Sequence, residues 1–295
     1  MGAIISASRR TDIPAWYADW FIARVEEGFC DVPHPRVRGR VSRIPLTPEE
    51  VALFVFWTKN PAPLEPHLPR LDRRGYRYVF LYTLNAYGRE IERGIPDRAG
   101  RIASFRRLAA RVGAERVVWR YDPILLSART GVDWHLEQFS AIARALSGST
   151  SRVIVSLVDF YRKTGPGFRE MERRGVQAER TPGERDLGIL ISGLAATARA
   201  CGMEIRSCAE PLERFGVEAG KCIDDVLIRR LFGLTVGPGR DRGQREACRC
   251  VPSRDIGVYD TCPGGCLYCY ATTDAERARR AAARCDPASG ALVRT

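Results

Sequence analysis

The sequence predicts an α/β protein, a partial (β/α) barrel of about six to seven strands. Seven short apolar runs alternate mostly with segments of helical period, an order that is typical of parallel sheets. No glycine-rich fingerprint follows the first apolar run, which argues against a dinucleotide-binding fold. A chain of 295 residues can bury a sizeable core. We therefore expect one barrel domain over residues 1–295, with a cysteine-rich segment at 233–270.

The first half of the chain supplies four of the seven runs. Each run is short and apolar, as a buried strand is, and each is followed by helical spacing or by proline and glycine. The predicted strands are 3–8, 53–58, 76–84 and 116–121. The first predicted helix begins at Pro14 and stops at Gly28. The second is short and proline-rich and ends near Gly75, and the third covers 102–112.

The second half continues the alternation with shorter strands. The predicted strands are 153–160, 204–207 and 255–259, and the predicted helices are 132–146, 187–200, 223–232 and 275–284. Residues 161–184 are rich in Arg, Gly and Pro and predict a loop with a short helix. Residues 233–252 have little period and many Gly, Arg and Cys residues, so we expect an irregular segment there.

The formal net charge of +12 is the excess of 47 basic over 35 acidic residues, and the only lysines are Lys59, Lys163 and Lys221. A nucleic-acid surface is one interpretation of this charge. A scattered, solvated basic surface is the other, and the absence of a dense basic run favours it.

The composition, the first residues and the cysteine count each narrow the class of protein. A hydrophobic content of 45% with 28% charged residues excludes bulk disorder, and no apolar run approaches the roughly 20 residues of a membrane helix. The first residues become charged too soon for a secretory signal, so we expect a cytoplasmic protein without a membrane partner. In that compartment ten cysteines suggest metal ligands or reactive thiols more than disulfides.

Polar side chains follow the predicted strands, where the chemistry of such barrels is placed. We predict cofactor-binding roles after the first two strands and catalytic roles after the later ones. Taken singly, each of the residues after the second and later strands is more typical of a salt-bridge or surface group, but their shared placement at strand ends favours them as a set. Thr11 or Asp12 before Pro14 is equally good helix-capping chemistry. The cofactor-binding candidates are Arg9, Arg10, Thr11, Asp12, Lys59 and Asn60, and the catalytic candidates are Arg120, Asp122, Lys163 and Glu210.

Cys262, Cys266 and Cys269 form a C-x3-C-x2-C spacing in TCPGGCLYCYA. Two glycines in the first gap let the backbone curl, so that three thiolates can converge. Three thiolates can hold three irons of a [4Fe-4S] cluster and leave the fourth iron open. A zinc site completed by Cys248 or Cys250, or a disulfide pair, are the structural alternatives.

The segment DIGVYDTCPGGCLYCYA resembles the signature of the radical S-adenosylmethionine (SAM) superfamily, and its ending is closest to the spore photoproduct lyase-like branch. Tyr268 occupies the aromatic position that flanks the adenine of SAM in that superfamily. The whole chain resembles a family known as a domain of unknown function, DUF1848. The segments that carry this resemblance are SASRRTDIPAWY, FVFWTKNPAPL, VVWRYDPILL, VIVSLVDFYRKT, GKCIDD and the cysteine tail.

The position of the cysteine motif departs from the superfamily. Its cluster loop ordinarily follows the first barrel strand, and here it follows the last one. Circular permutation is the simplest account, because it costs little when the termini lie close. Residues 255–259 would then take the first-strand place, and 3–8 the second.

Seven cysteines lie outside the motif. Four of them could hold a second cluster, a zinc ion, or only pack as small hydrophobes, namely Cys208, Cys222, Cys248 and Cys250. The other three stand alone and are expected to be structural or surface thiols, namely Cys30, Cys201 and Cys285. The three histidines have no metal-like spacing, so packed or solvated roles are expected for them.

The resemblance implies a [4Fe-4S] cluster, SAM, a reductant such as flavodoxin or ferredoxin, and a 5′-deoxyadenosyl radical that removes hydrogen from an unknown substrate. A nucleic acid or nucleotide substrate is suggested only by analogy at the level of the fold. The alternative from another class is a nucleic-acid-binding protein in which zinc or a cluster braces the C-terminal segment without radical chemistry.

Overall fold

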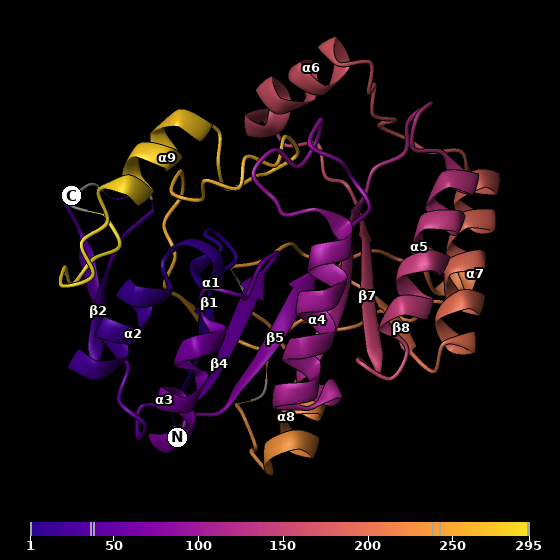
Figure 1. Ribbon diagram of the computed structural model, residues 1–295. Coiled ribbons are helices and arrows are strands. Elements are labelled where there is room, and N and C mark those ends of the chain that lie inside the picture. Colours follow the sequence, from indigo (N-terminus) through magenta and orange to yellow (C-terminus); the bar gives the residue numbers. More distant parts are fainter. Residues whose placement is uncertain (1, 36, 38, 238, 242, 294–295) are drawn as a thin grey trace. The chain divides into compact units, whose positions relative to one another are not determined.

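A computed structural model describes residues 2–35, 37, 39–237, 239–241 and 243–293. The chain is an α/β protein with a seven-stranded sheet and a separate two-stranded sheet (Figure 1). The strands of the large sheet are β1 (Ala3–Ala7), β4 (Val51–Thr58), β5 (Tyr78–Thr83), β6 (Val117–Ile124), β7 (Arg152–Leu157), β8 (Glu204–Ser207) and β9 (Arg254–Asp255). Their order in the sheet is β8-β7-β6-β5-β4-β1-β9. The predicted α/β class is confirmed, but among the described residues this order shows no pairing of β8 with β9 that would close the sheet into a barrel.

The chain divides into two compact units. The first comprises residues 1–80, 253–265 and 269–295, and the second comprises 81–252 and 266–268. Strand β5 contributes residues to both. Within the described part of either unit, the pairs β1·β4, β1·β9, β6·β7 and β7·β8 are parallel.

The first unit packs α2 (Ala18–Glu27) on the sheet through aromatic side chains. The Phe21 ring lies edge-on to Phe54 and Phe56 of β4, with centroids 5.1 and 5.3 Å away. The helix ends at Gly28, whose left-handed φ of 89° disfavours other residues, as the sequence predicts. The other helices here are α1 (Ile13–Trp16), α3 (Leu68–Arg73) and α9 (Ala275–Ala283), with the 3-10 turn η1 (Glu65–His67).

An antiparallel hairpin in the first unit was not predicted. Strands β2 (Phe29–Pro33) and β3 (Val41–Pro45) pair with Cys30 opposite Ile44. Each strand is five residues long and ends in proline, and β3 is mostly exposed. Such a short, polar pattern carries a weak strand signal because only alternate residues of β2 are buried.

The second unit has its helices beside β6, β7 and β8. Helices α5 (Val132–Leu146) and α7 (Glu184–Ala200) run alongside each other (Figure 1). Phe139 of α5 stacks on Trp119 of β6 at 4.7 Å, which fixes the helix on the strand. The remaining helical elements are α4 (Arg98–Val112), α6 (Gly165–Arg173), α8 (Asp225–Phe232) and the 3-10 turns η2 (Ala114–Arg116), η3 (Arg162–Thr164) and η4 (Glu213–Phe215).

No helix in the described part of the chain is long and apolar enough to cross a membrane.

Most predicted elements are found within a few residues of their expected bounds. Strand β9 is shorter than the expected 255–259. The amide of Ile256 still donates to Ser6 (3.0 Å), but the next two amides donate to side chains, Gly257 to Asp255 and Val258 to Thr11. Side-chain acceptors therefore end the strand early.

Candidate functional site

The loop after β1 holds the segment that leads to the cysteine motif. Asp255, at the end of β9, accepts hydrogen bonds from the hydroxyls of Ser6 (2.8 Å) and Ser8 (2.7 Å) and from the amide of Arg9 (2.8 Å). Thr11 shares a hydrogen bond with Thr261 (2.6 Å) and donates to the carbonyl of Val258 (2.8 Å). The residues at the end of β1 and directly after it therefore hold residues 253–261 in place through hydrogen bonds.

The two arginines of this loop lie over aromatic rings. The guanidinium of Arg9 is 5.0 Å from the Trp57 ring centroid and donates to Ser253 (3.0 Å). That of Arg10 is 5.1 Å from the Tyr259 ring and donates to Gly257 (3.4 Å). Stacking of this kind leaves the planar cations oriented rather than free to rotate.

Asp12 performs the capping role that the sequence offers as an alternative. Its carboxylate accepts from the amide of Ala15 (3.1 Å) at the start of α1 and from the amide of Lys59 (2.7 Å) after β4. Burial raises the pKa of Asp12 to about 6. Asn60 makes a local turn, since its side-chain oxygen accepts from the amide of Ala62 (3.3 Å). The contact between Asp12 and Lys59 joins the segments that follow β1 and β4.

Two thiols of the cysteine motif, Cys262 and Cys269, belong to the first unit. Cys262 accepts hydrogen bonds from the amides of Asp12 and Gly264, and Cys269 accepts one from the amide of Ala271 (3.4 Å). Burial, with Asp12 and Cys269 nearby, raises the pKa of Cys262 to about 12. Gly265 has φ 63°, which explains the need for glycine in the first gap.

Cys266 and Tyr268 belong to the second unit, where the loop pairs with residues 91 and 92. Cys266 forms an antiparallel bridge with Glu92, and the amide of Leu267 donates to Ile91 (3.0 Å). The Tyr268 hydroxyl donates to the Glu92 carboxylate, and Glu92 is in turn paired with Arg101 at 3.2 Å. Both charged side chains are 2% exposed.

Burial and the Glu92 charge raise the pKa of Tyr268 well above its usual value. The Tyr268 ring is therefore held as a neutral phenol by a buried ion pair. Neither Glu92 nor Arg101 was singled out from the sequence. Glu92 lies in a polar loop, and Arg101 lies at the start of α4, where an arginine is usually solvated.

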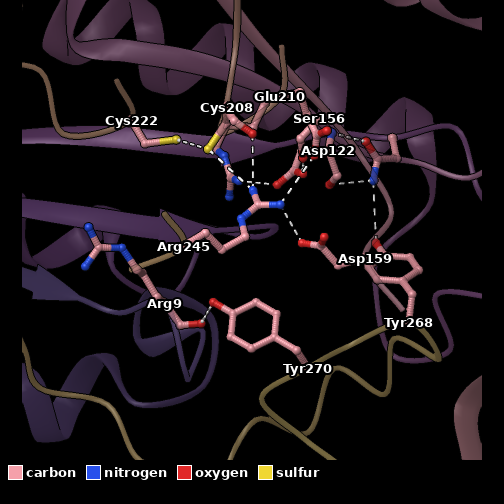
Figure 2. A network of polar contacts seen from close by, with 12 residues as sticks. Arg9, Asp122, Ser156, Asp159, Cys208, Glu210, Cys222, Arg245, Tyr268 and Tyr270 are labelled. Carbon is pink, nitrogen blue, oxygen red and sulfur yellow. Dashed lines mark hydrogen bonds and ion pairs between the residues drawn. The ribbon is translucent and has the colours of Figure 1, made fainter. Parts of the chain in front are cut away.

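A second polar group lies at the carboxyl ends of β6 and β7 (Figure 2). Asp122 is paired with Arg120 and accepts a hydrogen bond from Ser156. Its backbone exchanges two 2.9 Å hydrogen bonds with the Asn85 amide group, whose nitrogen is also 3.5 Å from the Tyr268 hydroxyl. Arg120 and Asp122 face the same way because alternate residues of a strand share a face.

Arg245 is the main functional candidate that the sequence did not indicate. Its guanidinium contacts Asp159 (2.5 Å), Glu210 (3.3 Å) and the carbonyl of Cys208 (3.2 Å) (Figure 2). Burial raises the pKa of Glu210 to about 7, against the opposite effect of Arg245. Arg245 was missed because it lies in the irregular segment 233–252, where no periodicity points to a structural position.

Of the predicted catalytic residues, the structure brings together Arg120 and Asp122, and the Asp122 charge also acts on Glu210. Lys163 lies in η3, after the end of β7, and its side chain is exposed. The four predicted second-site cysteines do gather. Cys208 and Cys222 have their sulfurs 3.3 Å apart, and Cys250 bonds to both Cys222 and Cys248.

The three remaining cysteines lie in three different elements of the fold. Cys30 is buried in β2, Cys201 ends α7, and Cys285 follows α9. Among the described residues, no set of three or more His, Cys, Asp or Glu side chains is already arranged to hold a metal ion. His135 is buried and bonds to Tyr121 (2.7 Å), so it is the packed histidine that the sequence predicts.

The sequence profile of a domain of unknown function, DUF1848, matches residues 4–271. This chain belongs to the DUF1848 family. In this DUF1848 chain the match begins in β1 and ends just after the last cysteine of the motif, so it spans both groups of polar residues described above. A search of curated proteins gave no match.

Proposed function

We propose that this DUF1848 protein is a radical SAM enzyme whose [4Fe-4S] cluster is held by Cys262, Cys266 and Cys269. One observation carries the proposal: the C-x3-C-x2-C loop follows β9, and β9 pairs in parallel beside β1. Read from β9, the strand order is β9-β1-β4-β5-β6-β7-β8, which is sequential once the last strand is placed first. That order supports a circularly permuted partial barrel with its cluster loop after the first strand.

Two features near the thiols support a cluster of this kind. Thiolate ligands are stabilised by amide hydrogen bonds to sulfur, and both Cys262 and Cys269 accept such bonds. Gly265 supplies the left-handed turn that a tight ligand loop needs. Cys262, Cys266 and Cys269 would hold the cluster, which would pass one electron from an external reductant to SAM and so supply the radical chemistry of hydrogen abstraction.

The chain's own residues provide orientation. Asp255 and Ser8 hold the strand from which the loop leaves, and Glu92 holds the Tyr268 ring that the resemblance places beside the adenine. Arg120, Asp122, Glu210 and Arg245 form a charged group at the carboxyl ends of the strands of the second unit. We assign them to substrate binding, since that edge is where such folds place ligands.

Anaerobic purification tests the proposal. The expected protein is brown, with about four irons per cluster, and it forms 5′-deoxyadenosine when given SAM and dithionite. Cys269→Ala should abolish both properties. Cys201→Ala, a substitution at the end of α7, is the matched control and should change neither.

A colourless protein loaded with zinc at the motif would overturn the proposal. It would support the alternative, a metal-braced nucleic-acid-binding protein. That protein should bind a single-stranded oligonucleotide with an affinity that falls steeply as salt is raised.

A further inference from the structure

Four cysteines outside the motif come together in the second unit: Cys208, Cys222, Cys248 and Cys250. The sulfurs of Cys208 and Cys222 are 3.3 Å apart, Cys222 is also hydrogen-bonded to Cys250, and Cys250 is hydrogen-bonded to Cys248. Three of the four are at most 6% exposed. The thiols therefore form one continuous sulfur cluster inside a single unit.

The backbone brings these cysteines together from three separate segments. The chain after β8 turns back on itself, with the Ser207 amide donating to Glu218 (2.9 Å) and the Gly220 amide donating to Ser207 (2.8 Å). This turn carries Cys222 back to Cys208, whose own amide donates to Val155 of β7 (2.8 Å).

The third segment is tied to the second by a hydrogen bond from the Val251 amide to Ile223 (3.2 Å). The approach of Cys222 and Cys250 is thus fixed by main-chain contacts. It does not depend on the rotamers of the thiols alone.

Two of the four sulfurs, those of Cys208 and Cys250, have neighbours that suit negative charge. The amide of Ile223 donates to the Cys250 sulfur at 3.4 Å, the kind of contact that stabilises thiolate ligands. The guanidinium of Arg245 lies 4.0 Å from the Cys208 sulfur and donates to the carbonyl of the same residue. An amide and a fixed cation therefore face two of the four sulfurs, which purely apolar packing of thiols does not require.

We propose that Cys208, Cys222, Cys248 and Cys250 bind one thiophilic divalent ion of the Zn²⁺ class. Four thiolates at about 2.3 Å from such an ion lie about 3.8 Å apart, so the observed 3.3 Å between Cys208 and Cys222 needs only a small opening. A four-iron cube between the thiolates would hold the sulfurs much farther apart. Each thiol releases its proton to solvent on binding, and Arg245 offsets part of the resulting negative charge.

A metal at this site would also anchor an irregular part of the chain. The described residues between α8 and β9 contain no helix or strand, although Cys248 and Cys250 are buried there. Long irregular segments need an anchor, and a metal bound from both sides would fix this one to β8. The ion would therefore hold Arg245 in place beside Glu210 and Asp159.

Cobalt titration of the full chain tests this site separately from the proposed cluster. The background is the variant with Cys262→Ala, Cys266→Ala and Cys269→Ala, which cannot bind a metal at the motif. It should take up one Co²⁺ per chain with the intense charge-transfer bands of tetrahedral thiolate coordination. Adding Cys222→Ser should abolish these bands, and adding Cys201→Ala should leave them unchanged. No uptake, or uptake that survives Cys222→Ser, would overturn the proposal.

A second measurement covers the case in which the triple variant does not fold. Native wild-type protein is alkylated with iodoacetamide before and after treatment with a chelator, and modified peptides are quantified by mass spectrometry. Alkylation of Cys208, Cys222, Cys248 and Cys250 should increase together after chelation, while that of Cys30 should not change. A Cys208–Cys222 disulfide in protein that was purified with a reductant and with metal would contradict the single-ion site. Iron and sulfide recovered on these cysteines would contradict it too.

Discussion

The hydroxyl of Ser8 donates a 2.7 Å hydrogen bond to the carboxylate of Asp255, although the two residues are 247 positions apart in the chain. The same carboxylate accepts from Ser6, from the amide of Arg9 and from the amide of Gly257. One half-buried side chain thus joins the first strand of the chain to its last strand. The position of the cysteine loop depends on this joint.

Replacement of Asp255 by alanine should destabilise the protein strongly. The change leaves two hydroxyls and two amides without their acceptor, and we expect the free energy of unfolding to fall by about 3 kcal/mol. Urea denaturation measures the effect. Asp133→Ala, at an exposed position of α5, is the control and should change stability by less than about 0.5 kcal/mol. Equal stability of the Asp255→Ala variant and the wild type would contradict the role of this joint.

Gly257→Ala tests how closely the two segments approach. A methyl group at residue 257 would lie 1.9 Å from the Ser8 hydroxyl oxygen and 2.7 Å from its Cβ. Neither atom can move without breaking the bond to Asp255, so we expect a loss of about 1–3 kcal/mol of stability. Gly237→Ala has open space around it and serves as the control. Thermal unfolding of the two variants gives the comparison, and similar melting temperatures would argue against the close approach.

The buried pair Glu92–Arg101 should be far more costly to break than to replace. Arg101→Ala leaves the Glu92 carboxylate, which is 2% exposed, without its counter-charge, and a loss of about 3–5 kcal/mol is expected. The double variant Glu92→Leu with Arg101→Met removes both charges and should recover much of that loss. A double-mutant cycle by urea denaturation gives the coupling energy. Additive effects of the two substitutions would be inconsistent with a direct ion pair.

His135 should make the stability depend on pH. Burial lowers its pKa to about 4, below the usual value of 6.5, so folding favours the neutral imidazole. The associated stability is complete above about pH 6.5 and is lost progressively as the pH falls towards 4, by up to about 3 kcal/mol. His135→Gln should remove this component. Unfolding free energies of both proteins at pH 7.5, 6 and 5 test it, and parallel curves for the two proteins would refute it.

Much of the fold could be predicted because its periodic signals are strong. Helix α5 and strand β8 have the bounds that the sequence predicts, 132–146 and 204–207. Both have unambiguous patterns, one an apolar stripe of helical period and the other a short run between a helix and a polar loop. The hairpin of β2 and β3 was missed because its two strands are short and partly exposed.

The candidate site could be predicted only in part, because contact depends on more than residue type. Asp122 and Glu210 were found because they follow strands, and parallel strands end at one edge of a sheet. Asp12 also follows a strand, yet its carboxylate caps α1 and holds Lys59. Lys163 follows β7 but is exposed, since the chain turns into η3 before it. Position after a strand therefore does not determine where a side chain points.

The sequence by itself determined the alternating α/β order and the C-x3-C-x2-C motif, because hydrophobic period and residue spacing are local properties. Only the tertiary structure decided which distant residues meet. It placed β9 beside β1, brought Arg245 to Glu210, and paired Glu92 with Arg101. These contacts satisfy buried charges and polar groups across long stretches of chain, and that requirement leaves no periodic trace in the sequence.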